Sequence, residues 1–134
     1  MLENYSKLIA IEAETMLGMF RKDIVPAAYT YLHRLADTGR SMKEMCPDVA
    51  CGQLCVMIEA LCGQTDALQS KAALLEGELA AAKQETDVKK AALVFRNRVL
   101  PAMDSARAVA DSIEQQIGEK YWPYPTYGAL LYGV

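Results

Sequence analysis

Apolar residues recur at intervals of three and four along most of the chain, and this spacing predicts long amphipathic helices. Polar residues, glycine or proline separate three such stretches. The sequence therefore predicts helices over residues 4–37, 49–83 and 87–117. The stripe of the second helix is the most regular, because it keeps a coiled-coil spacing over four heptads. Its members are Leu54, Ile58, Leu61, Thr65, Leu68, Ala72, Leu75, Leu79 and Ala82.

Local signals place the ends of these helices. Gly39 suits a left-handed cap after the first helix, and Asp48 suits the start of the second. Thr86 is expected to cap the third helix, and Gly118 to end it. The link between the second and third helices is very short, so these two should lie antiparallel. The predicted fold class is all-α: an up-down-up bundle of three long helices with an extended aromatic C-terminal tail, in a single domain over residues 1–134.

One motif occurs twice. Phe-Arg-x-x-(β-branched)-(aliphatic)-Pro-Ala covers residues 20–27 and again residues 95–102. Pro26 and Pro101 each remove a backbone donor from a helix, so each is predicted to bend it. The first and third helices of such a bundle run parallel, which places the two motifs at about the same level. Coincidence is the alternative explanation, because eight positions are few.

The tail, residues 119–134, carries five of the ten aromatic residues of the chain and almost no charge. Its two prolines exclude a regular helix, and its aromatic side chains are typical interface anchors. We expect it to lie against a surface, either its own bundle or the rest of a larger protein. The residues predicted to dock are Tyr121, Trp122, Pro123, Tyr124, Pro125, Thr126, Tyr127, Gly128, Leu130 and Leu131.

Composition limits the partners and the cellular compartment that the sequence is compatible with. A net charge of −3 argues against nucleic acid or an anionic membrane as partner. No apolar run approaches the roughly 20 residues that span a bilayer. The cysteines are close together in sequence, which favours reduced thiols in a cytoplasmic protein over a disulfide framework. They are Cys46, Cys51, Cys55 and Cys62.

The sequence offers few candidate metal ligands or catalytic residues. Cys51 and Cys55 share a helix face and are two possible zinc ligands, but a tetrahedral site needs two more. Buried thiols that fill the core are the favoured interpretation. His33 is the only histidine and is expected on the surface. Met16 and Met19 are expected in the core.

The isolated helical glycines are interpreted as sites of close helix packing, since no glycine-rich phosphate loop is present. They are Gly18, Gly52, Gly63 and Gly77.

The tail resembles a known signature. Residues 121–131 are similar to the C-terminal Tyr-Trp-Pro-(aromatic)-Pro-Thr-Tyr-Gly-x-Leu-Leu of the type III glutamine synthetases. Residues 11–16 and 24–27 resemble the entry helix of the last domain of that family, and residues 98–103 resemble the segment before its final turns. The chain is therefore identified as similar to the C-terminal domain of those enzymes.

This resemblance implies a structural or assembly role in a large, ring-shaped ligase that joins ammonia to glutamate. The parent enzyme would use ATP and a divalent metal, Mg²⁺ or Mn²⁺, bound in a catalytic domain upstream. No residue here matches the catalytic, cofactor-binding or metal-binding motifs, so none is assigned. Ala129 and Tyr132 depart from the residues usual in the family, and no salt bridge is carried over to position 129.

The implied chain is a non-catalytic piece of a larger enzyme, with the catalytic domain as partner and neighbouring subunits as a further option. Two other functions stay open. One is a free-standing, coiled-coil-like adaptor that binds a partner helix through the seam of the second helix. The other is a small metal-binding bundle that uses the cysteines.

Overall fold

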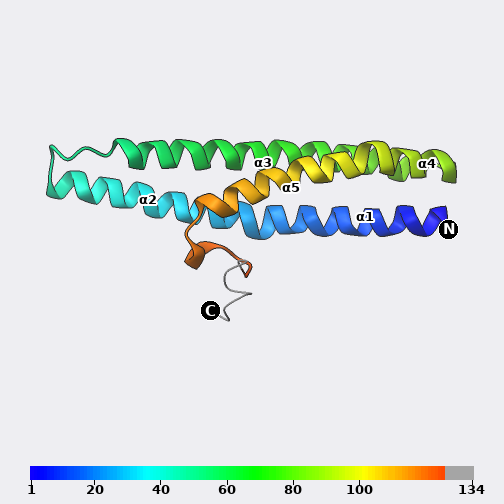
Figure 1. The fold of residues 1–134 in the computed structure, drawn as a ribbon, viewed down its shortest axis with the longest axis horizontal. Coiled ribbons are helices and arrows are strands. Elements are labelled where there is room, and N and C mark those ends of the chain that lie inside the picture. Colours follow the sequence, from blue (N-terminus) through cyan, green and yellow to red (C-terminus); the bar gives the residue numbers. More distant parts are fainter. Residues whose placement is uncertain (126–134) are drawn as a thin grey trace.

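The computed structural model describes residues 1–125, and within them the fold is all-α, as predicted. Three helical rods lie side by side, and a short terminal segment returns toward the first rod (Figure 1). The first rod contains α1 (Leu2–Met19), η1 (Phe20–Ile24) and α2 (Val25–Met45), and the second is α3 (Gly52–Gln84). The third contains α4 (Val88–Val94), η2 (Phe95–Val99) and α5 (Leu100–Gln116), and it is followed by the 3₁₀ turn η3 (Glu119–Tyr121).

The heptad seam of α3 lies at the centre of the bundle. From Leu61 onward its members face the other two rods and are almost fully buried. Thr65 is the one polar member among them, and its hydroxyl donates to the carbonyl of Leu61 at 2.7 Å. This bond gives the buried hydroxyl a partner and so offsets the cost of removing it from water. The rest of the core comes from the rods on either side of α3: Ile9, Ala13, Met16, Leu17, Phe20, Ile24, Ala28, Phe95, Val99, Met103, Ala106, Ala110, Ile113 and Ile117.

The first rod is longer than predicted, and the expected break at Gly39 is wrong. The helix continues to Met45, with Gly39 inside it. A Cβ added at Gly39 would lie 3.0 Å from Cδ2 of Leu54. The glycine therefore allows α2 and α3 to approach closely rather than ending the helix.

Two predicted caps are also wrong. Helix α3 begins at Gly52 instead of residue 49, so Asp48 is not its cap. The ammonium of Lys43 donates to the carbonyl of Val49, which holds that residue outside the helix. Helix α4 is capped by Asp87 rather than Thr86, because the Asp87 carboxylate accepts from the backbone N–H groups of residues 89 and 90.

The repeated motif forms the same local structure twice. Each copy is a five-residue π-helical turn that lies directly before the residue preceding proline. The N–H of Val25 donates to the carbonyl of Phe20, and the N–H of Leu100 donates to that of Phe95. Each turn thus contains one residue more than an α-turn, and this widening relieves the crowding that the proline ring imposes.

The two π-turns do not lie at the same level, contrary to the prediction. Phe20 lines a hollow with Leu68 and Ala72 of α3, whereas Phe95 lines one with Ala82. The motifs therefore contact α3 at positions more than two turns apart. This offset arises because α1 precedes the first π-turn with 18 residues and α4 precedes the second with only 7.

Candidate docking surface at the tail

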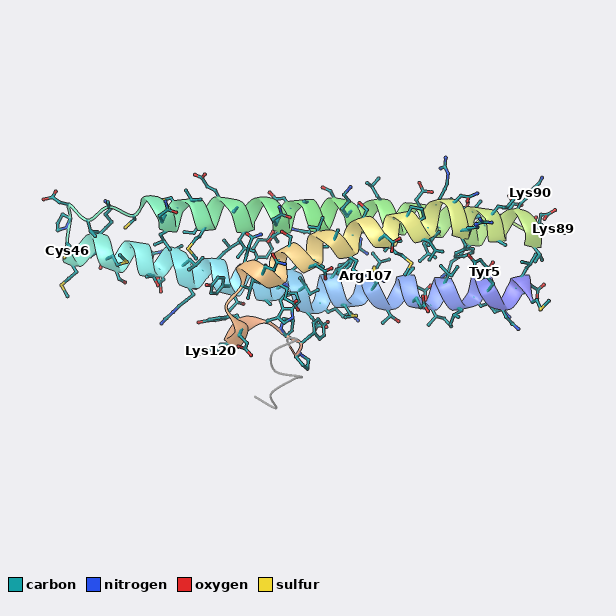
Figure 2. All side chains as sticks on the ribbon, viewed as in Figure 1. Tyr5, Cys46, Lys89, Lys90, Arg107 and Lys120 are labelled. Carbon is teal, nitrogen blue, oxygen red and sulfur yellow. The ribbon has the colours of Figure 1, made fainter. Side chains whose placement is uncertain are left out.

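The described part of the tail lies against the helices. After α5 the chain turns at Gly118, and η3 directs residues 122–125 along the first rod (Figures 1 and 2). Tyr121, Trp122 and Tyr124 are half-buried and pack against the hydrophobic core. The two prolines between and after them are exposed. The structure thus brings three of the predicted docking residues onto one surface.

Tyr121 is held by an aromatic contact. Its ring lies 5.2 Å from that of Tyr31 of α2, with an interplanar angle of 54°. Gly118 permits this approach, because a Cβ there would lie 3.3 Å from Cε1 of Tyr31. The ammonium of Lys120 lies 5.8 Å from the centre of the Tyr121 ring. The contact fixes the point at which the tail joins the first rod.

Tyr124 is held by a hydrogen bond across 101 positions of sequence. Its hydroxyl donates to Oδ2 of Asp23, in η1, at 2.6 Å. Burial, the hydrogen bond to Asp23 and the negative charge of that carboxylate together raise the pKa of Tyr124 to about 12. All three causes favour the neutral phenol over the phenolate. The bond is therefore complete at neutral pH.

Trp122 lies beside Tyr124 in an edge-to-face arrangement, with ring centroids 6.1 Å apart and an interplanar angle of 79°. Its indole Nε1 is buried and has no hydrogen-bond partner among the described residues. A buried donor without an acceptor costs free energy. The Trp122 ring is therefore held by apolar and aromatic packing.

A groove of about 490 Å³ opens next to these rings, between α1, η1, α5 and the tail. Ile11 and Met19 of α1 line it and remain 61% and 38% exposed. Arg107 of α5 also lines it and pairs with Asp104 at 3.4 Å. Apolar walls with a few polar groups at the edge are typical of a surface that binds a partner segment.

The sequence did not identify Asp23 or Tyr31 as contacts of the tail. Both lie in the first rod, far from the tail in sequence. The burial of Met16 confirms one prediction, but Met19 is exposed, so its assignment to the core is wrong. Met19 lines the open groove between α1, α5 and the tail, so it stays partly accessible to solvent.

Five of the residues predicted to dock lie outside the described part of the chain: Thr126, Tyr127, Gly128, Leu130 and Leu131. Pro26 is the second residue of α2 and Pro101 the second residue of α5, and one residue separates each proline from the π-turn before it.

The cysteines do not fill the core, so that prediction is wrong. Cys46, Cys55 and Cys62 are exposed and Cys51 is half-exposed. Cys46 directly follows α2 and Cys51 directly precedes α3, so both lie at the α2–α3 connection, an end of the bundle that α5 does not reach (Figure 1). Within residues 1–125, no three or more His, Cys, Asp or Glu side chains form a group that could hold a metal ion. The exposed position of His33 is confirmed.

The four helical glycines that were predicted to be sites of close packing are not such sites. A Cβ added at any of the four positions would meet no atom within 4 Å. These positions face open space because the other rods cover different sides of their helices. They are Gly18, Gly52, Gly63 and Gly77.

Comparison with known proteins identifies relatives of the whole chain. Residues 1–43 match the family described as the glutamine synthetase C-terminal domain. The chain is 31% identical to a glutamine synthetase of Butyrivibrio fibrisolvens over 134 residues, which is 100% of this chain and 19% of that protein. It is 25% identical to a glutamine synthetase of Bacteroides fragilis, over 98% of this chain and 18% of that protein. The type-3 glutamine synthetase of Dictyostelium discoideum is 23% identical over 98% of this chain and 18% of its own length.

The chain thus spans about a fifth of the length of the curated relatives it matches. No solved structure matches it significantly. None of the helices in residues 1–125 combines the length and apolarity needed to cross a membrane. The predicted resemblance to the C-terminal domain of type III glutamine synthetases is confirmed.

Proposed function

We propose that this chain, which belongs to the glutamine synthetase family as a C-terminal domain, is a non-catalytic scaffold of a larger enzyme. That enzyme makes glutamine from glutamate, ammonia and ATP. The observation that carries the proposal is the similarity along the full chain to about a fifth of each relative. A domain that accounts for so little of the enzyme leaves the ligase chemistry to the remaining polypeptide.

The features of the fold support a structural role. The described residues form long rods around one apolar seam, and their titratable groups are mostly exposed. General acid–base catalysis needs such groups held together in a cleft. We therefore place the bound ATP and the Mg²⁺ or Mn²⁺ in the catalytic domain upstream. Cytoplasmic localisation is part of the same proposal, because the substrates are cytoplasmic metabolites.

The tail is the proposed contact with the rest of the assembly. Trp122, Tyr124 and the groove beside them present apolar and aromatic area at a fixed place on the first rod. The hydrogen bond to Asp23 and the contact with Tyr31 orient this surface before any partner arrives. Preorganisation of this kind lowers the entropic cost of binding. The partner is the catalytic domain or a neighbouring subunit.

The adaptor hypothesis is less well supported. It needs the heptad seam of α3 to be free for a partner helix, and from Leu61 onward that seam is buried inside the chain. A partner helix would have to displace α1 and α5 and expose the core.

An activity assay tests the non-catalytic assignment. The isolated chain, incubated with glutamate, ammonia, ATP and Mg²⁺, is expected to form no glutamine, whereas the full-length enzyme forms it under the same conditions. Glutamine formation by the isolated chain above a no-protein control would contradict the proposal.

A further inference from the structure

A second exposed apolar surface lies at the opposite end of the first rod from the α2–α3 connection. We call it the N-terminal patch; it consists of Met1, Leu2, Tyr5, Val88 and Leu93. The side chains of Leu2, Tyr5 and Leu93 are 42%, 38% and 53% exposed. They come from α1 and α4, which pack against each other. Large apolar side chains gathered in this way, from two elements, mark a surface that is covered in the working protein.

The patch surrounds a hollow of about 760 Å³, lined by residues of α1 on one side and of α4 and η2 on the other. Lys89 and Arg96 also line this hollow. Lys90 follows Lys89 in sequence, and Figure 2 shows both lysines at this end of the bundle. Within residues 1–125, none of these three cations forms an ion pair. The surface that fits this patch is therefore apolar at its centre and acidic at its rim.

We propose that the N-terminal patch is the docking site for the catalytic domain of the same polypeptide. That domain would contact the patch with an apolar surface bordered by carboxylates. This inference rests on the proposed function. In the relatives, about four-fifths of the protein lies outside the match, and the matching family is a C-terminal domain. A C-terminal domain follows the rest of its polypeptide, and α1, the first helix of the matched region, lines the patch.

The covalent connection favours the catalytic domain of the same polypeptide over a separate protein as the partner that covers this patch. A domain that enters at the edge of the patch is present there at a high effective concentration, so modest apolar contact is enough to keep it docked. A second copy of the domain would bring the same uncompensated cations to the contact. Lys89 would then face like charge rather than carboxylates.

Hydroxyl-radical footprinting of the full-length enzyme tests the proposal. Tyr5 and Tyr29 of α2 are 38% and 47% exposed in this chain, so they should be oxidised at similar rates if nothing covers them. With the catalytic domain docked, Tyr5 is expected to react about fivefold or more slowly than Tyr29, because interface cores exclude water. Equal rates for the two tyrosines would overturn the proposal.

Matched variants show whether protection depends on the patch. In the full-length enzyme, Leu93→Asp is expected to restore oxidation of Tyr5, whereas Leu74→Asp on α3, 61% exposed, should leave it protected. Arg96→Glu is a second variant, at the charged edge of the patch, and it should raise Tyr5 oxidation without touching the core. Protection that survives both Leu93→Asp and Arg96→Glu would contradict the assignment.

Crosslinking identifies the occupant. Carbodiimide joins Lys89 to a neighbouring carboxylate, and enzyme assembled from a mixture of ¹⁴N- and ¹⁵N-labelled subunits shows whether the linked peptides share a chain. Links within one chain from Lys89 to a carboxylate outside this domain support the proposal, and links to the catalytic domain that occur only between chains contradict it. If footprinting shows Tyr5 unprotected in an enzyme that still needs this domain to assemble, the inference fails and the proposed function stands. An enzyme that assembles unchanged without the domain counts against the proposed function itself.

Discussion

At the scale of single residues, the position of the tail depends on a few contacts with the first rod. Tyr121 contacts Tyr31, and Tyr124 donates to Asp23. The aromatic content of the tail predicted that it would pack against a surface. Nothing in the sequence indicated which residues of that surface would contact it. A tyrosine and an aspartate that are separated by 101 positions have no local signature. Contacts of this kind follow from how the rods pack.

The bond between Tyr124 and Asp23 makes stability depend on pH at the alkaline end. The pKa of Tyr124 rises to about 12 in the folded chain, above the value of 10 for a free tyrosine. The contribution is therefore fully present below pH 10 and is lost as the pH rises through about 12, where the phenolate would face the Asp23 carboxylate. Tyr124→Phe should cost about 1 kcal/mol of unfolding free energy at pH 8. Its stability should also fall less than that of the wild type between pH 10 and 12.

Denaturant unfolding at several pH values measures both effects. Tyr29→Phe is the matched control, since it removes an exposed phenol that accepts from Gln69 at 2.9 Å. It should keep the alkaline fall of the wild type. A Tyr124→Phe variant with the wild-type pH dependence would show that the bond to Asp23 does not contribute.

At the scale of elements, spacing predicted the three rods well. The seam of α3 and the antiparallel link between α3 and α4 follow directly from the positions of apolar residues. The ends of the helices were harder to predict from the sequence, because they depend on tertiary contacts. Gly39 has the residue type of a cap, yet its closeness to Leu54 keeps it inside a helix. The π-turns were visible only as a repeated motif, since their extra residue leaves the apolar spacing almost unchanged.

The π-turns predict an unusual tolerance to deletion. Removing the exposed Lys22 should convert η1 into an α-turn and keep the faces of α1 and α2 aligned, because a π-turn holds one residue more. The change needs Pro26→Ala alongside it, since the proline ring would otherwise clash with the tightened turn. The combined variant should lose less than about 2 kcal/mol of unfolding free energy.

Deleting the exposed Ser70 from α3 is the control. It rotates the remainder of a regular helix by about 100° and removes the seam from the core. This variant should not fold, as judged by circular dichroism and thermal melting. Equal losses of unfolding free energy in the two deletion variants would mean that η1 does not contain one residue more than an α-turn.

The open glycines of α3 predict a gain in stability. Gly63→Ala should raise the unfolding free energy by about 1 kcal/mol, because the added methyl meets no neighbour and the unfolded chain loses freedom. Gly39→Ala should gain less, since its Cβ would press on Leu54. Thermal melting compares the two. A Gly63→Ala variant less stable than the wild type would show that this face is in contact with something in solution.

At the scale of the whole molecule, the fold is a rod-shaped scaffold with two apolar surfaces, one at the tail and one at the N-terminal patch. They lie at separate places along the bundle, so the domain is able to contact two parts of an assembly at once. The fold class and the family were predictable from the sequence, because helical spacing and a tail signature are local properties. The patch was not predictable, because its residues come from two helices that only the folded bundle brings together.

The mass of the assembled enzyme tests the central claim most directly. Sedimentation velocity would compare the full-length glutamine synthetase with a version that ends just before this domain, at equal concentration. The account predicts that the full-length enzyme sediments as one large oligomer and that the shortened enzyme sediments as smaller, heterogeneous species. A shortened enzyme with the same subunit number, the same homogeneity and the same thermal stability as the full-length enzyme would contradict the account.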